Sequence, residues 1–133
     1  MSNQQPVKII KADEIGKQDA GYTEGMSRKS ALVGCCDNLS SSIMDAEPNS
    51  SSAIHHHGEQ NTIVYALSGR GSIAYGPDKS QRVELLPGDH ALIPAFVEHQ
   101  EVNASNEPIR WIIVRSGSTP KVVNLEGWGA SKK

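Results

Sequence analysis

The chain has 133 residues and a formal net charge of -2 at pH 7, and its 13 lysine and arginine residues form no long basic run. This length suits a single domain, which buries roughly 68% of its unfolded surface and needs no disulfide staple to build a core. The charge balance argues against a nucleic acid partner.

The N-terminal segment shows no targeting signal. Its first residues, MSNQQPVKII, lack the charged head and apolar core of a signal peptide, and no stretch approaches the roughly 18 apolar residues of a membrane span. We therefore expect a cytoplasmic protein with no membrane partner. Residues 1–30 are predicted to form an N-terminal extension, in which the apolar residues 7–10 could add an edge strand at a homodimer contact.

Short runs of β-forming residues recur after residue 30, where no segment has a helical period. Turn residues such as Pro48-Asn49 and Pro87-Gly88 separate them. Eight short strands at this spacing predict an all-β fold, a single jelly-roll barrel over residues 31–128. We expect the strands at residues 31–36, 42–46, 63–67, 71–75, 81–85, 91–93, 98–102 and 109–115.

The C-terminal segment is expected to pack on the rest of the protein. Residues 121–128 are too apolar for a free tail, so they should pack across the barrel or a dimer contact, and only residues 129–133 should be flexible.

Cys35 and Cys36 are adjacent on a predicted strand and would point to opposite faces. We expect no disulfide between them.

Three consecutive histidines, His55, His56 and His57, precede a short apolar run. Alternate side chains of a strand share a face, so His55 and His57 should point one way and His56 outward or toward a subunit contact. A second segment, GDHALIPAFVEHQEVN at residues 88–103, contains His99. If His99 lies on a neighbouring strand, three imidazoles converge, a donor set that suits one divalent Fe, Ni, Zn, Mn or Cu ion.

These two segments resemble the two motifs of the cupins, G-x5-H-x-H-x(3 or 4)-E-x6-G and G-x5-P-x-G-x2-H-x3-N. The resemblance covers roughly residues 40–115, and it implies a small single-domain cupin that binds a metal ion at these histidines and commonly forms a dimer. The matching positions are His55, His57 and Gly69 in the first motif and Gly88, Pro94, His99 and Asn103 in the second.

The chain departs from these motifs at three positions. Phe96 replaces the middle glycine of the second motif. Asn49 replaces the first glycine of the first motif, and it follows Pro48 in a predicted turn where asparagine tolerates the left-handed conformation. Thr62 replaces the metal-binding glutamate. A hydroxyl is a weaker ligand than a carboxylate, so either the ion has three protein ligands or another residue supplies the fourth.

Three neighbours could supply that fourth ligand, namely Glu59, Gln60 and Asn61. Gly58 is expected to bend the strand and to turn Glu59 outward. Gln60 is therefore our predicted fourth ligand. Its neutral amide would leave the ion more positive than a carboxylate does, which favours Lewis-acid chemistry over a high oxidation state.

Glu101 shares a strand face with His99 and is predicted to point into the barrel. A buried carboxylate implies a metal ion, a basic partner or a proton-transfer role. We predict that Glu101 is a catalytic general base beside the ion. The alternatives are a metal ligand, as in the pirin branch of the cupins that this segment resembles, and a solvated side chain after a bulge.

Other candidates concern the substrate, which we expect to be a small organic molecule. Tyr65, Phe96, Trp111 and Arg115 are the predicted substrate-binding residues. Trp111 and Arg115 share a face by the period of two, and an inward arginine would select an anionic substrate, whereas an arginine at the rim would be solvated. His90 follows a turn and is not expected to be a ligand.

The main functional prediction is a metal-dependent cupin enzyme, either a dioxygenase or a non-redox cyclase, isomerase or lyase, with the cyclase type preferred. The alternatives are a barrel that binds or senses a small ligand without catalysis, and a pirin-like interaction protein. The fold cannot separate these functions, because one scaffold supports many.

Overall fold

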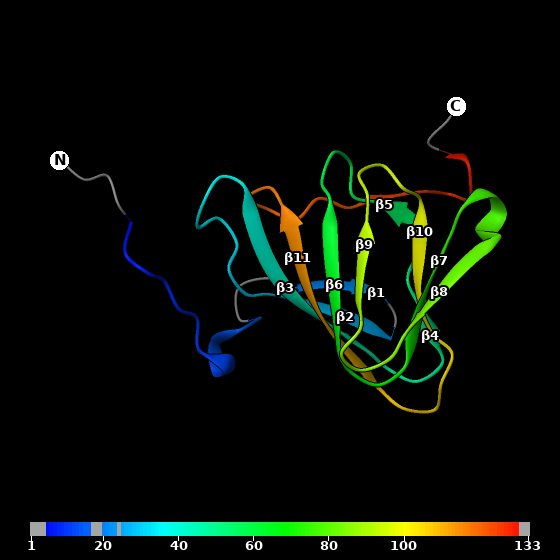
Figure 1. The fold of residues 1–133 in the computed structure, drawn as a ribbon, viewed down its shortest axis with the longest axis horizontal. Helices are drawn as coiled ribbons and strands as arrows, with labels where there is room; N and C mark the ends of the chain where they lie inside the picture. The colour runs from blue at the N-terminus through cyan, green and yellow to red at the C-terminus, as the bar shows by residue number, and fades with distance from the viewer. Residues whose placement is uncertain (1–4, 17–19, 24, 131–133) are drawn as a thin grey trace.

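The computed structural model describes residues 5–16, 20–23 and 25–130, and it shows a jelly-roll barrel of two antiparallel sheets that face each other (Figure 1). None of its described helices is long and apolar enough to cross a membrane. The first sheet has the order β1 (Ala20–Thr23), β2 (Met26–Ser30), β3 (Leu39–Ala46), β11 (Ile109–Ser116), β6 (Thr62–Ser68) and β9 (His90–Ile93). The second has the order β12 (Val123–Asn124), β5 (His55–His56), β10 (His99–Asn103), β7 (Gly71–Tyr75) and β8 (Gln81–Leu85), and β4 (Ser50–Ser51) also pairs with β10. Two short 3-10 helices are η1 (Ala12–Glu14) and η2 (Pro77–Lys79).

The all-β barrel predicted from the sequence is confirmed, and every expected strand but one coincides with an observed strand. The exception is residues 31–36, where the prediction is wrong. This segment forms bends that are tied to β3, because the N–H of Ser41 donates to the carbonyl of Leu32 at 2.9 Å. Cys35 and Cys36 therefore do not lie on a strand, and both are free thiols.

Part of the predicted N-terminal extension belongs to the barrel. β2 pairs with β3 along its whole length, and Met26 at its start is fully buried in the core. The sheet thus begins upstream of residue 31. Residues 7–10 form no strand within this single chain, and Val7 is 99% exposed, so the edge strand expected at a dimer contact stays a prediction.

The C-terminal segment packs across the barrel, as the sequence predicts. β12 pairs with β5, where Val123 lies opposite His56. The N–H of Leu125 donates to the carbonyl of Ile54 at 2.9 Å. Of the predicted flexible tail, residues 131–133 lie outside the described residues.

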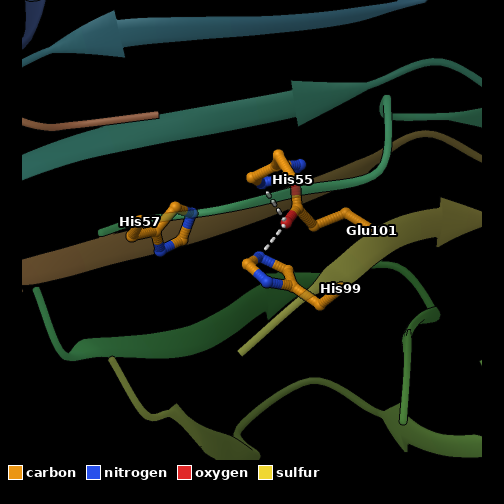
Figure 2. A group of neighbouring side chains, drawn as sticks. All are labelled: His55, His57, His99 and Glu101. Carbon is orange, nitrogen blue, oxygen red and sulfur yellow. Dashed lines mark ion pairs between the residues drawn. The ribbon is translucent and has the colours of Figure 1, made fainter. Parts of the chain in front are cut away.

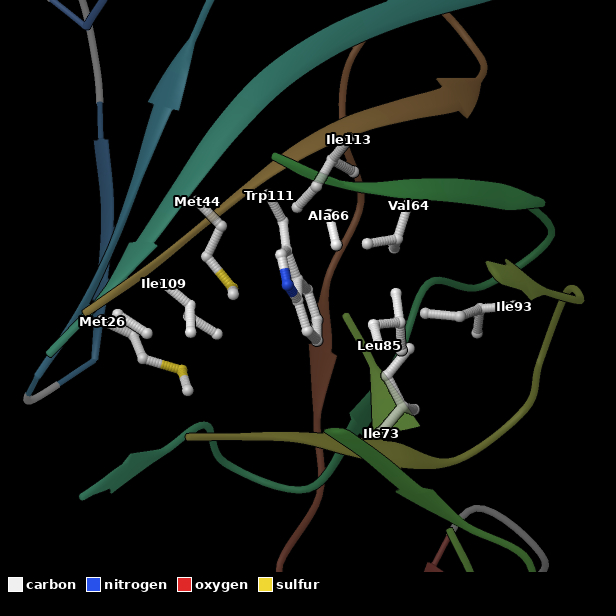
Figure 3. Close-up of a cluster of buried hydrophobic side chains, with 11 residues drawn as sticks. Met26, Met44, Val64, Ala66, Ile73, Leu85, Ile93, Ile109, Trp111 and Ile113 are labelled. Atoms are coloured by element: carbon white, nitrogen blue, oxygen red, sulfur yellow. The ribbon is translucent and has the colours of Figure 1, made fainter. Parts of the chain in front are cut away.

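Alternation along β11 builds the core. Trp111, Ile113 and Arg115 point inward and are buried, whereas Arg110 and Val114 are exposed, so the predicted shared face of Trp111 and Arg115 is confirmed. Trp111 lies among the aliphatic and methionine side chains of both sheets (Figure 3). The buried cluster consists of Met26, Met44, Ala46, Val64, Ala66, Ile73, Leu85, Ile93, Ile109, Trp111 and Ile113.

The barrel interior has an apolar end and a polar end. On the inner face of β3, Met44 and Ala46 pack into the hydrophobic core, whereas Ser40 and Ser42 are buried further along the same face. Ser40 lies opposite Arg115 in the pairing of β3 with β11. On the other side of β11, Arg115 lies opposite Thr62 of β6, so small polar residues flank the buried guanidinium.

Two motif positions have clear structural roles. Asn49 has a φ of 58°, which confirms the left-handed conformation predicted for it. Asn103 is fully buried, and its amide donates to the carbonyls of Glu47 at 3.0 Å and Glu107 at 2.8 Å while its oxygen accepts from the N–H of Ser105. Asn103 therefore holds the loop after β10 against the end of β3.

We predict that Gly69→Ala destabilises the protein more than Gly88→Ala. Both glycines have positive φ, so each alanine should lose about 1–2 kcal/mol through backbone strain. A Cβ at Gly69 would also lie 2.6 Å from Cγ2 of Ile109, whereas none of the described atoms lies within 4 Å of a Cβ at Gly88. Urea denaturation of both variants measures the difference, and equal losses of stability would contradict the packing argument.

Candidate metal centre

The centre is built on the pairing of two short strands. His55 of β5 lies directly opposite His99 of β10, and their ring centroids are 4.3 Å apart. His57 follows β5 by one residue, with its ring centroid 5.1 Å from that of His55 and 4.7 Å from that of His99. All three imidazoles are buried, so the structure brings together the three predicted histidines.

Backbone carbonyls fix the tautomers of two of these rings. Nδ1 of His55 lies 2.7 Å from the carbonyl oxygen of Ala53, and Nδ1 of His99 lies 2.9 Å from that of Val97. A carbonyl only accepts hydrogen bonds, so each Nδ1 carries the proton. In a neutral imidazole this leaves a lone pair on Nε2, the form that binds metals.

Thr62 orients the third ring. Its hydroxyl lies 2.8 Å from Nδ1 of His57, and both side chains are buried. The residue that replaces the glutamate of the cupin motif therefore acts on the outer nitrogen of a histidine. Nε2 of His57 remains free to face the centre.

Glu101 supplies the carboxylate. Its Oε2 atom lies 3.1 Å from Nε2 of His55 and 2.8 Å from Nε2 of His99 (Figure 2). Its Oε1 atom accepts a hydrogen bond from Nη2 of Arg28 at 2.5 Å. The backbone N–H of Glu101 donates to the hydroxyl of Ser52 at 3.0 Å, which holds the strand in register at this point.

The four side chains fit a metal ion. Their ligand atoms all lie within 4.8 Å of one another, and Nε2 of each histidine is buried without a hydrogen-bond partner among the described residues. Lone pairs of two imidazoles and a carboxylate that face one another repel, unless a positive charge, either a proton or a metal ion, lies between them. Three imidazoles and one carboxylate are a common donor set for divalent transition metals.

Burial and charge set the protonation of the centre. Burial, with a further effect of the nearby Arg115 charge, lowers the pKa of His57 to about 2. Burial raises the pKa of Glu101, but the neighbouring His55 and His99 outweigh it and hold that pKa well below its usual range. At neutral pH His57 is therefore neutral and Glu101 ionised, as ligands must be.

Gln60, the predicted fourth ligand, makes its hydrogen bonds with the C-terminal segment and not with the histidine cluster. Its amide nitrogen donates to the carbonyl of Thr119 at 2.7 Å, and its amide oxygen accepts from the N–H of Lys121 at 2.9 Å. Both ends of the amide thus attach the C-terminal segment to the barrel. Glu59 is exposed and pairs with Lys121 at 2.9 Å, in line with its predicted outward direction.

The predicted substrate-binding residues fall into two groups. Trp111 and Arg115 point inward and are buried. Tyr65 lies on the outer face of β6, since Thr62, Val64 and Ala66 of that strand are the buried ones, and it contacts His90 with ring centroids 4.8 Å apart. Phe96 has a φ of 64° and is 63% exposed, so it does not fill the barrel.

Two further histidines were considered from the sequence. His90 is exposed and is not part of the cluster, as expected. His56, which was expected to face outward or toward a subunit contact, is buried within the chain. Its Nδ1 accepts a hydrogen bond from the N–H of Gly58 at 2.9 Å, which stabilises the bend after the histidines, and Val123 of β12 lies opposite it in the sheet.

A cavity of about 550 Å³ reaches the centre at His99. It opens between β7, β8 and β9, and much of its wall is apolar, which suits a small organic molecule. The lining residues are Ile73, Tyr75, Val83, Glu84, Leu85, Asp89, His90, Ala91, Leu92, Ile93, Pro94, Val97 and His99.

Arg28 is the functional residue that the sequence analysis missed. It lies on β2, in a segment taken for a polar extension, and its contact with Glu101 spans 73 positions of the chain. Its position two residues after the apolar Met26 could have indicated that Arg28 points into the barrel, because alternate residues of a strand share a face and Met26 is buried in the core.

Acid should destabilise the metal-free protein through His57. The unfolded chain binds a proton at this residue near pH 6.5, whereas the folded pKa is about 2. Between these values the unfolded state holds the extra proton, so stability falls as pH is lowered, by about 1.4 kcal/mol per pH unit for one group. Urea midpoints of chelator-treated protein between pH 7 and pH 5 measure this slope.

Two variants test the assignment of that slope. His57→Asn should flatten the pH dependence, because it removes the titrating group. His90→Asn, at an exposed site, should leave it unchanged. A slope that His57→Asn does not alter would assign the acid sensitivity to other groups.

Comparisons with known proteins agree with this architecture. A family model described as the cupin domain matches residues 42–115, and no curated protein matches the chain. The polyketide cyclase RemF from Streptomyces resistomycificus superposes with a TM-score of 0.74 and 20% identity, over 94% of this chain and 89% of that one. KdgF from Halomonas sp. gives a TM-score of 0.68 and 18% identity, over 84% and 94%.

The manganese-containing oxalate decarboxylase of Bacillus subtilis is similar over part of its length. It has a TM-score of 0.73 and 19% identity, and the match covers 84% of this chain but 31% of that one. At such identities the structural likeness concerns the fold. The family model, however, covers more than half of the sequence and includes all four residues of the cluster, so this chain belongs to the cupin family.

Proposed function

We propose that this protein is a metal-dependent enzyme that acts on a small organic molecule. One divalent transition ion is held by His55, His57, His99 and Glu101. The observation that carries the proposal is the convergence of three buried Nε2 atoms, which have no hydrogen-bond partner among the described residues, and one carboxylate, beside a cavity that His99 helps to line. When bound, such an ion supplies Lewis-acid chemistry and polarises an oxygen of the substrate.

Glu101 is better suited to bind the ion than to act as a general base. Its Oε2 atom lies between the imidazoles, and its pKa is held well below the usual range. A general base is most effective when its pKa lies near the working pH. The base role predicted from the sequence therefore becomes the alternative, and the carboxylate takes the place that Gln60 was expected to fill.

Arg28 favours non-redox chemistry. Its guanidinium donates to Glu101 at 2.5 Å and so draws electron density away from the carboxylate that faces the ion. A ligand that donates less leaves the ion a stronger Lewis acid and stabilises a high oxidation state less well. We therefore favour a cyclase, isomerase or lyase over a dioxygenase, and the fold shared with the polyketide cyclase RemF is compatible with this choice.

The remaining side chains position the substrate. The apolar wall of the cavity beside His99, with Ile73, Leu85 and Ile93, excludes water from the centre. Trp111 is buried in the hydrophobic core and does not line this cavity. The homodimer expected from the sequence remains a prediction, which sedimentation in solution decides.

We predict about one ion per chain in protein purified without an affinity tag. Glu101→Ala should weaken metal binding at least about tenfold, since it removes a ligand. Gln60→Ala should keep the ion and lose only stability, because its amide bonds to the backbone of Thr119 and Lys121. Metal analysis and melting temperatures with added Zn, Ni, Fe or Mn measure both effects. At a hundredfold excess over its dissociation constant the ion should add about 2.7 kcal/mol of stability.

Glu59→Ala is the matched control, since Glu59 is an exposed carboxylate close in sequence to the histidines. It should change neither the metal content nor the melting shift. Wild-type protein without ion and without a melting shift would refute the proposal, and loss of the ion in Gln60→Ala alone would restore the ligand set expected from the sequence.

Turnover of a substrate found by screening should not depend on oxygen. A Lewis-acid reaction proceeds equally under air and under argon, whereas a dioxygenase stops without oxygen. Rates measured under both gases with the same metal load distinguish the two classes. Tight binding of a ligand with no turnover under either gas would favour the binding or sensing function instead.

A further inference from the structure

A second, smaller cavity lies at the polar end of the barrel. Its volume is about 180 Å³, and we call it the arginine cavity. It is lined by Arg28, Ser30, Val33, Ser42, Arg115, Thr119, Pro120 and Val122. No carboxylate is among these residues, and it shares none of them with the cavity beside His99.

Several hydrogen-bond donors at this cavity lack an acceptor. Arg115 is 2% exposed, and its Nη1 atom donates to the carbonyl of Lys121 at 2.9 Å, but its Nε atom has no partner among the described residues. The same holds for Nε of Arg28, whose Nη2 atom binds Glu101. The hydroxyl of Ser40, which lies opposite Arg115 in the sheet but does not line the cavity, also has no partner among the described residues. Buried donors of this kind normally have a partner, so an acceptor is missing.

The charges of the side chains around the arginine cavity also indicate an anion-binding site. Arg28 and Arg115 bring two positive charges, and Glu101 is the one carboxylate that the described residues place against either of them. One carboxylate carries a single negative charge, so Glu101 does not neutralise both arginines. An uncompensated buried charge is costly, which favours a site that an anion completes.

We infer that the arginine cavity binds an oxyanion, the carboxylate or phosphate group of a small organic molecule. A guanidinium presents its N–H groups in a planar fork that matches two oxygen atoms of such a group. The volume corresponds to about six water molecules, enough for the oxyanion and a few carbon atoms. The inference goes beyond the proposed function, because it gives the protein a second site, distinct from the cavity beside His99, for an organic anion.

The position of Arg28 links this site to the metal centre. One of its nitrogens binds Glu101 while the side chain lines the arginine cavity. The guanidinium of Arg28 would therefore lie between an anion bound in this cavity and the carboxylate of Glu101.

The test measures the binding of acetate, inorganic phosphate and the neutral acetamide to the protein as purified. Isothermal titration and melting temperatures are recorded at constant ionic strength set with chloride. We expect saturable binding of at least one oxyanion and none of acetamide. The tighter of the two oxyanions identifies the group as a carboxylate or a phosphate. Equal binding of acetamide, or no saturable binding of either oxyanion, would overturn the inference.

Variants locate the bound anion. Arg115→Gln should weaken oxyanion binding at least tenfold, whereas Arg110→Gln should leave it unchanged, since Arg110 is exposed on the same strand and pairs with Asp45 at 2.7 Å. Ser30→Glu places a carboxylate inside the cavity. It should abolish oxyanion binding and raise the melting temperature in oxyanion-free buffer, a result that stands even if Arg115→Gln does not fold.

Metal content measured on the same samples separates this inference from the proposed function. Loss of oxyanion binding with the ion retained supports the arginine cavity. Oxyanion binding that persists in Ser30→Glu at full strength would place the anion elsewhere, on the metal centre or at the surface, and would refute the cavity. A wild-type protein without ion that still binds oxyanion through Arg115 would refute the proposed metal chemistry alone.

Discussion

The carboxylate of Glu101 is the interaction on which the polar half of this barrel depends. One oxygen faces the imidazoles of His55 and His99, and the other accepts from Arg28. Without it, a buried guanidinium and a group of buried imidazoles would lie close together with no negative charge between them, an arrangement that costs several kcal/mol. Its place on β10, two residues after His99, lets one strand deliver both side chains to the cluster.

Periodicity and turn residues were enough to predict the barrel. Strands with one buried face alternate in a way that the sequence shows directly, as β11 does with Trp111 and Ile113 inside and Arg110 outside. The segment at residues 31–36 was misread because its apolar residues suggest a strand, although they form bends against β3. Tyr65 was misread for a related reason, since a tyrosine suits either face of a sheet and only the tertiary packing selects the outer one.

The three histidines were predictable because local geometry places them. His55 and His57 come from one short stretch, and a single strand pairing adds His99. The fourth group was harder to choose, because a side-chain amide and a carboxylate compete for it and the sequence does not show which backbone groups lie nearby. Gln60 is occupied by the segment at residues 119–121, and Arg28 reaches Glu101 from a distant strand. Both facts depend on long-range pairing.

The substitutions within the cupin motifs have physical consequences that fit together. Thr62 replaces a carboxylate by a hydroxyl, and this hydroxyl orients His57 instead of facing the centre. The negative charge of the motif is thereby not lost but lies on Glu101, on the facing strand. Phe96 keeps the left-handed backbone that a glycine adopts more easily, at a strain of order 1–2 kcal/mol, while its N–H donates to the carbonyl of Gly58 at 2.8 Å. That bond connects the segment that carries His57 to the segment that carries His99, so the left-handed backbone at Phe96 helps to hold the two histidines in one site.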